Sequence, residues 1–161
     1  RKDIMKLKNT VLIVNNLEQS KKFYKQVLGL KVLLDFHGSV TLSSGIVLQS
    51  KEIWKDLIHK TDQDIMMVNH AVELSFETED IDAFMLVLDQ YHVTLLHPPK
   101  EGTWGQRVVR FYDPDGHIIE VGESMRKIIK RLVSQGFSYE ELAHRLRLPL
   151  DYIKQILESH S

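Results

Sequence analysis

The chain contains no cysteine among its 161 residues. This excludes disulfide frameworks, thiol catalysis, iron–sulfur clusters and zinc sites built on thiolates. Only 8 glycines and 4 prolines are present, which argues against a collagen-like or disordered chain. No apolar run approaches the ~20 residues of a membrane-spanning helix, and no signal peptide is recognisable. We therefore expect a globular cytoplasmic protein with no membrane partner.

What is present suits one domain with a small appendage. Hydrophobic residues make up 43% of the chain and charged residues 27%, and the net charge of −1 provides no general attraction to nucleic acid. The charge changes near Ser124, because residues 1–123 carry a net −4 and residues 124–161 a net +3. We therefore predict one domain over residues 5–123 and a helical extension over residues 124–161.

A pattern of strand, helix and three strands occurs twice in the first 123 residues. The first module, residues 7–50, has strand candidates at 8–14, 31–36, 39–43 and 46–50, with a helix between the first two. The second module, residues 69–122, has strand candidates at 70–76, 93–96, 106–112 and 118–122, with a helix at 80–91. A repeat of this size indicates that each module buries its sheet against its twin.

The extension has the pattern of three short amphipathic helices. Gly136 ends the first helix, Ser138 and Glu141 form a capping box that opens the second, and Pro149 suits the first turn of the third. This arrangement is similar to a helix-turn-helix. The third helix offers few polar contacts and the extension is only modestly basic, which favours a packing role over DNA binding.

Two segments carry a resemblance to a known family. The segments Asn15–Tyr24 (NNLEQSKKFY) and Phe111–Glu120 (FYDPDGHIIE) resemble signatures of the glyoxalase/bleomycin resistance/extradiol dioxygenase (vicinal oxygen chelate) superfamily. The resemblance covers residues 7–123. It implies an α+β fold in which two βαβββ modules form a curved mixed sheet around a cavity, followed here by the three-helix tail, and it implies a homodimer.

The resemblance also implies four metal-ligand positions on the first and fourth strands of the modules. In this sequence they are occupied by Asn9, Gln49, His70 and Glu120. A divalent ion such as Zn, Ni, Mn or Fe prefers imidazole and carboxylate ligands, so two amides predict a weak or degenerate metal site. The alternatives are that Asn9 and Gln49 bind a polar ligand or satisfy each other. No organic cofactor is expected.

Strand patterning singles out further residues. Glu120 lies between Ile119 and Val121, where a buried carboxylate must find a metal, a cation or a raised pKa. Alternation places Arg110 and Tyr112 on the strand face opposite Val109 and Phe111, and the resemblance implies that this face is the cavity wall that also carries Glu120. Tyr112 is then a candidate ligand contact, and Arg110 either clamps an anionic ligand or neutralises Glu120.

Trp104 is flanked by Gly102 and Gly105. This segment resembles a loop over the mouth of the cavity, where the indole would stack on a ligand. A packed surface tryptophan is the alternative.

Three functions are compatible with these residues. The resemblance implies a metal-assisted lyase or isomerase acting on a small oxygen-rich molecule, with His70 as a metal ligand and Glu120 as both ligand and base. Gln49 accepts no proton at neutral pH, so a mechanism with two carboxylate bases is not expected. The alternatives are a metal-free binding or resistance protein for a small molecule, and a ligand-sensing regulator that binds DNA through its tail; nucleic acid is not the partner we expect.

Overall fold

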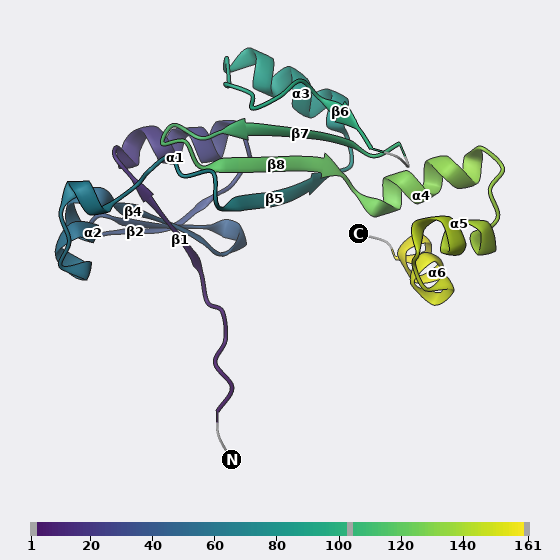
Figure 1. Ribbon diagram of the computed structural model, residues 1–161, viewed down its shortest axis with the longest axis horizontal. Helices are drawn as coiled ribbons and strands as arrows, with labels where there is room; N and C mark the ends of the chain where they lie inside the picture. Colours follow the sequence, from purple (N-terminus) through teal and green to yellow (C-terminus); the bar gives the residue numbers. More distant parts are fainter. Residues whose placement is uncertain (1–2, 103–104, 160–161) are drawn as a thin grey trace. The chain divides into compact units, whose positions relative to one another are not determined.

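The computed structural model describes residues 3–102 and 105–159, and its chain divides into two compact units. The first unit contains the described residues up to Glu73, together with Tyr91–Val93 and Tyr112–Ile118. The second unit contains Leu74–Gln90, the described residues between Thr94 and Phe111, and the described residues from Ile119 onward. Each unit is built on one four-stranded sheet (Figure 1).

The sheet of the first unit has the order β1-β4-β3-β2. Its strands are β1 (Thr10–Val14), β2 (Val32–Phe36), β3 (Ser39–Leu42) and β4 (Ile46–Ser50). β1 is parallel to β4, and β3 is antiparallel to both β4 and β2. This mixed arrangement arises because α1 (Leu17–Gln26) crosses between β1 and β2, whereas short turns join the later strands.

Local signals fix the ends of α1. The side chain of Asn16 accepts a hydrogen bond from the backbone N–H of Gln19 (3.0 Å), which satisfies a free donor in the first turn. After the last turn, Gly29 has φ +68°, a left-handed conformation that costs glycine little. α2 (Lys51–Ile58) directly follows β4, and short 3-10 turns lie at Ser43–Gly45 and Asp62–Asp64.

The sheet of the second unit has the order β5-β8-β7-β6. Its strands are β5 (Glu73–Thr78), β6 (Lys100–Glu101), β7 (Arg107–Tyr112) and β8 (Ile118–Glu123). α3 (Ile81–Gln90) follows β5, as α1 follows β1. The sequence pattern at 93–96 predicts a strand that the structure does not form: only Leu95 makes an isolated bridge, to Phe111, and the edge strand is the shorter β6.

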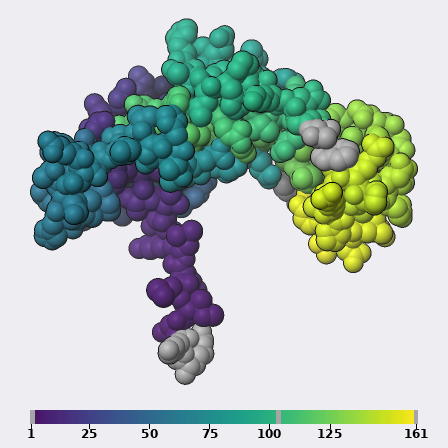
Figure 2. All heavy atoms as spheres, in the orientation of Figure 1, coloured from purple at the N-terminus to yellow at the C-terminus, as the bar shows by residue number. Residues whose placement is uncertain are grey.

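The repeated order of strand, helix and three strands confirms the predicted α+β fold, with a three-helix tail. The tail consists of α4 (Met125–Ser134), α5 (Tyr139–Leu146) and α6 (Leu150–Glu158). Ile129, Leu142 and Ile153 are fully buried at its centre, and the three helices gather into one group of spheres in Figure 2. The predicted capping box of Ser138 and Glu141 is confirmed. Among the described residues, no helix is long and apolar enough to cross a membrane.

Candidate functional site

Glu120 lies on β8 between two buried apolar residues. Ile119 is fully buried and Val121 is 3% exposed, so alternation directs the Glu120 side chain to the opposite face of the strand. There the Arg110 guanidinium donates to Oε2 (2.5 Å) and the Ser75 hydroxyl donates to Oε1 (3.0 Å). The sequence predicts that this carboxylate finds a metal, a cation or a raised pKa, and in the described structure it is paired with a cation, Arg110.

The face of β7 that carries Arg110 is the one that alternation predicts. Val109 and Phe111 are fully buried, and the Phe111 ring packs on Phe84 of α3 at a centroid distance of 5.7 Å. Val108 and Arg110 point to the other side of the sheet. The second unit thus has a face covered by α3 and a face with polar side chains.

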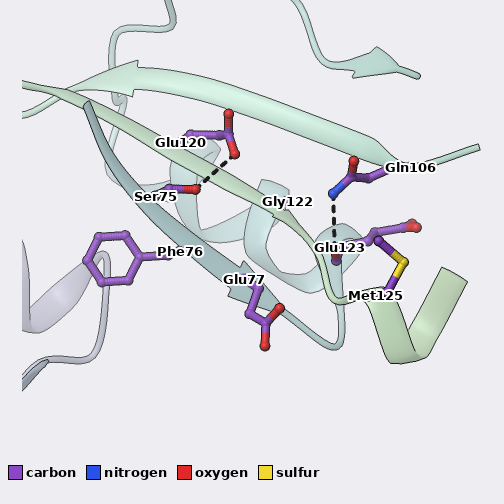
Figure 3. Close-up of a pocket in the computed structure, with 8 residues that line it drawn as sticks. All are labelled: Ser75, Phe76, Glu77, Gln106, Glu120, Gly122, Glu123 and Met125. Atoms are coloured by element: carbon purple, nitrogen blue, oxygen red, sulfur yellow. Dashed lines mark hydrogen bonds between the residues drawn. The ribbon is translucent and has the colours of Figure 1, made fainter. Parts of the chain in front are cut away.

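A pocket of about 330 Å³ lies on this polar face, entirely within the second unit. It is lined by Ser75, Phe76, Glu77, Gln106, Glu120, Gly122, Glu123 and Met125, which are drawn in Figure 3. The side chains of Ser75 and Glu77 lie on one side of β5, and the Phe76 ring points away from them (Figure 3). Alternation along β5 therefore gives the pocket a hydroxyl and a carboxylate from that strand.

Gly122 provides space in this pocket. The φ angle of Gly122 is one that any residue can adopt, so glycine is not required by the backbone conformation. Its effect on the pocket comes from the missing side chain. A Cβ at this position would lie 3.3 Å from the Gln106 Nε2 atom and 3.7 Å from Val108. A side chain at position 122 would therefore reduce the volume available to a ligand.

Glu123 is held on the covered side of the sheet. Its side chain is 1% exposed, and it accepts hydrogen bonds from Arg107 Nε (2.6 Å) and from the Arg131 guanidinium (2.8 Å). Burial alone would raise the pKa of Glu123, but the hydrogen bonds from Arg131 and Arg107 outweigh it and hold the pKa below its usual range. Arg107 also pairs with Asp82 of α3. This cluster attaches α3 and α4 to the sheet.

The other predicted ligand positions lie in the first unit. Gln49 is buried, and its amide nitrogen donates to the Gly38 carbonyl (3.1 Å), so it is satisfied by the backbone and not by Asn9. Asn9 is half-buried and immediately precedes β1. The predicted strand at 70–76 starts three residues later than expected, which leaves His70 outside β5, exposed and with φ +54°.

His70 and Tyr112 lie together, with 2.9 Å between His70 Nε2 and the tyrosine hydroxyl oxygen. Tyr112 was predicted as a ligand contact, and its described hydroxyl partner is this imidazole. Trp104 lies outside the described residues, so its predicted role stays a prediction.

The chemistry of the donor set does not fit a tightly held divalent metal. Two of the four positions carry neutral amides, and both Glu120 oxygens are engaged by protein donors. Within either unit, no three histidine, aspartate or glutamate side chains of the described residues gather as a metal site. We therefore assign no chemical step to a metal, and the divalent ion stays a prediction.

A buried polar network at the turn between β7 and β8 has no counterpart among the residues that the sequence pattern singles out. Asp113 accepts a hydrogen bond from the Tyr24 hydroxyl (2.7 Å), and Asp115 accepts from the Asn15 backbone (3.0 Å) and the Ser20 hydroxyl (3.3 Å). Burial raises the pKa of Asp113, and burial together with that carboxylate raises the pKa of Tyr24 well above its usual value.

His117 belongs to the same turn. Its Nε2 atom donates to the Ile13 carbonyl (2.7 Å), so this histidine is a structural contact and not part of the hairpin surface. The Asp-Pro-Asp-Gly segment signals a turn, but nothing in its local pattern indicates that the turn binds the start of α1, a hundred residues earlier in the chain.

Comparison with known proteins places this architecture in a family. The model of the glyoxalase-like domain matches residues 7–126. The chain therefore belongs to the glyoxalase-like family, within the glyoxalase/bleomycin resistance/dioxygenase superfamily.

Individual relatives are similar over the same region. The uncharacterized protein YraH of Bacillus subtilis (strain 168) is 29% identical over 124 residues, which cover 73% of this chain and 97% of YraH. A protein of unknown function from Agrobacterium tumefaciens strain C58 is 36% identical with a TM-score of 0.67, and the match covers 77% of this chain and 98% of that protein. A glyoxalase/bleomycin resistance protein/dioxygenase from Nocardioides has the same fold, at 18% identity with a TM-score of 0.61, over 76% of this chain and 85% of that protein.

Most of the helical tail lies outside the family match. YraH and the Agrobacterium protein are matched over almost their whole length, yet 27% and 23% of this chain stay unmatched. The family match ends at residue 126, one residue after α4 begins.

Proposed function

We propose that this chain binds a small polar molecule in the pocket of the second unit, without requiring a metal. The observation that carries the proposal is the position of Glu120, which faces the pocket from between two buried apolar residues of β8 and is paired with Arg110. A carboxylate in such a place is costly unless its charge is compensated, and it then serves as an acceptor for a ligand.

The lining indicates the chemistry of the ligand. Glu77 and Glu120 are acceptors, and among the described residues no side chain pairs with the Glu77 carboxylate. Ser75 and Gln106 add neutral polar groups, and Met125 adds an apolar surface. A ligand with hydroxyl or amino donors and a short apolar part therefore suits the pocket better than an anion does.

Three single-ring probes with different head groups test this preference. Benzylamine, benzyl alcohol and benzoate are titrated separately into isotopically labelled protein, and amide shifts are followed by NMR. We expect benzylamine to bind more tightly than benzyl alcohol and benzoate to bind weakest, with shifts centred on β5 and β8. Tightest binding of benzoate, or no binding by any probe, would contradict the proposal.

Gly122→Ala tests whether the probes occupy this pocket. The new methyl group meets the flexible end of Gln106, so the fold should tolerate it, while the space for the ring is reduced. We expect benzylamine affinity to fall about fivefold, a loss of about 1 kcal/mol. An unchanged affinity would place the probe elsewhere.

Metal-assisted lyase or isomerase chemistry is the second candidate. It is favoured by the match to the glyoxalase-like domain and by the place of Glu120 on the last strand of the second module. The test is metal analysis of protein purified without chelator, followed by activity assays with added Zn, Ni, Mn or Fe. Stoichiometric metal that is lost in Glu120→Gln would favour this candidate over metal-free binding.

The remaining expectations concern assembly and location. We propose a homodimer, which sedimentation equilibrium tests directly, and a cytoplasmic location, with which the lack of cysteine is compatible. Nucleic acid stays outside the expected partners, because the exposed residues of α6 include Asp151 and Glu158 as well as Lys154.

A further inference from the structure

The helical tail begins at the wall of the pocket. Met125 is the first residue of α4 and one of the lining residues, and Figure 3 shows it among Gln106, Gly122 and Glu123 at one end of the site. A methionine side chain is long and apolar, so it limits the size of whatever lies beside it. One boundary of the pocket is therefore made by the first residue of the helical tail.

Several contacts fix α4 to the sheet at this point. The Ser124 backbone N–H donates to the Thr78 carbonyl (3.1 Å), and the Ser124 hydroxyl caps α4 by accepting from the Lys127 N–H (3.1 Å). One turn further on, Arg131 donates to Glu123 (2.8 Å) and to the Gly105 carbonyl (2.6 Å). These contacts hold both the start of α4 and the chain next to Gln106.

The other two helices of the tail pack against α4. Ile129 of α4 is fully buried against Leu142 of α5 and Ile153 of α6, and Met125 packs against the same cluster. The position of Met125 therefore depends on the folded three-helix group and not only on its neighbours in the sheet.

We infer that the tail sets the size limit of the ligand: Met125 closes one end of the pocket, and Arg131 is the positioning residue that holds it there through Glu123. This inference rests on the proposed function. It assigns to the extension a role in ligand selection.

Two probes of different length test the size limit. Benzylamine and 4-phenylbenzylamine share a head group, but the second has an additional ring that must pass the Met125 side chain. In Met125→Ala we expect the affinity for 4-phenylbenzylamine to rise at least fivefold, and that for benzylamine to change less than twofold. Arg131→Met should shift the ratio of the two affinities in the same direction. Met66→Ala is the matched control, since Met66 is 74% exposed in the first unit.

Thiol labelling gives a second measurement, because the chain has no cysteine of its own. Saturating benzylamine should slow maleimide labelling of Met125→Cys at least fivefold and leave labelling of Met66→Cys unchanged. If benzylamine does not bind the unsubstituted protein, the proposed function itself fails. If it binds, but both the size preference and the labelling rate are insensitive to position 125, only the role of the tail is overturned.

Discussion

Two carboxylates of the first unit and one of the second have different surroundings. In the first unit, Asp113 and Asp115 are buried and bonded to Tyr24, Ser20 and the backbone, so they join distant parts of the chain. In the second unit, Glu120 faces a pocket and shares it with Glu77. The buried carboxylates stabilise the fold, whereas Glu120 lies at a pocket, where an oxygen that already accepts one hydrogen bond can accept a second from a ligand.

The fourth strands of the two modules show the same contrast. Gln49 on β4 is buried and its amide binds a backbone carbonyl, whereas Glu120 on β8 forms an ion pair beside the pocket. Equivalent positions in a repeated fold thus have a structural role in one copy and a candidate binding role in the other. The proposed ligand site therefore uses the fourth strand of the second module and not that of the first.

The largest effect on stability is expected from Glu123, whose buried carboxylate is bonded to Arg107 and Arg131. Glu123→Ala leaves Arg107 and Arg131 without their shared partner, and both guanidinium groups are partly exposed and regain water. We expect a loss of about 2–3 kcal/mol in the free energy of unfolding, measured by urea denaturation. A loss as small as that of the exposed control Asp151→Ala would show that the cluster does not anchor α4.

A smaller effect is expected from the carboxylate network of the first unit. Asp115→Ala removes the acceptor of the Asn15 N–H and the Ser20 hydroxyl, and should cost about 2 kcal/mol of unfolding free energy. Because Asp115 has a structural role, benzylamine affinity should change less than twofold. Loss of binding at unchanged stability would reverse the proposed division of roles.

The pH dependence should have opposite signs for the two buried carboxyl groups. The pKa of Glu123 is lower in the folded protein than its ordinary value of 4.5, so the ionised carboxylate stabilises the fold at any pH above 4.5. This stabilisation is lost as the pH falls through the lowered pKa. The pKa of Asp113 is higher in the folded protein than its ordinary value of 3.8, so on acidification the folded state binds this proton at a higher pH than the unfolded state does. The free energy of unfolding therefore gains from Asp113 as the pH falls toward 3.8.

Urea denaturation at pH 7, 5.5 and 4 measures both signs. On acidification, the difference in unfolding free energy between the unsubstituted protein and Glu123→Gln should shrink. Over the same pH range, the unfolding free energy of the unsubstituted protein should rise relative to that of Asp113→Asn. Parallel curves for the two variants would contradict the assigned environments.

The smallest stability effect is expected from Tyr24→Phe. The variant loses one hydrogen bond to Asp113, which keeps its backbone donors from Asp115 and His117. We expect a loss of about 1 kcal/mol and a further rise in the pKa of Asp113, observed by NMR titration of its carboxyl carbon. A loss above that of Asp115→Ala would mean that Tyr24, and not the turn, dominates the network.

Local patterns predicted most of the fold. The repeated strand and helix periodicities predict seven of the eight strands in the described residues, and alternation together with the family resemblance places Arg110 and Glu120 on one face. The exception, β6, is only two residues long, so it carries no periodicity to detect. Capping residues predicted the helices of the tail because those signals lie within a few residues of one another.

Contacts between distant segments could not be predicted in this way. The bonds of Asp115 to Asn15 and Ser20 span about a hundred residues, and the late start of β5 moved His70 out of the strand. The pocket wall at Met125 depends on how α4 leaves the sheet, which is set by Ser124, Glu123 and Arg131 together.

The ratio of benzoate to benzylamine dissociation constants, in the unsubstituted protein and in Glu120→Gln, tests the central claim most directly. With Glu120 present, the ratio should be at least tenfold in favour of the amine; in Glu120→Gln the negative charge beside the pocket is lost, which should bring the ratio close to one or invert it. The same ratio in both proteins, or a preference for benzoate in the unsubstituted chain, would contradict a ligand site built around Glu120.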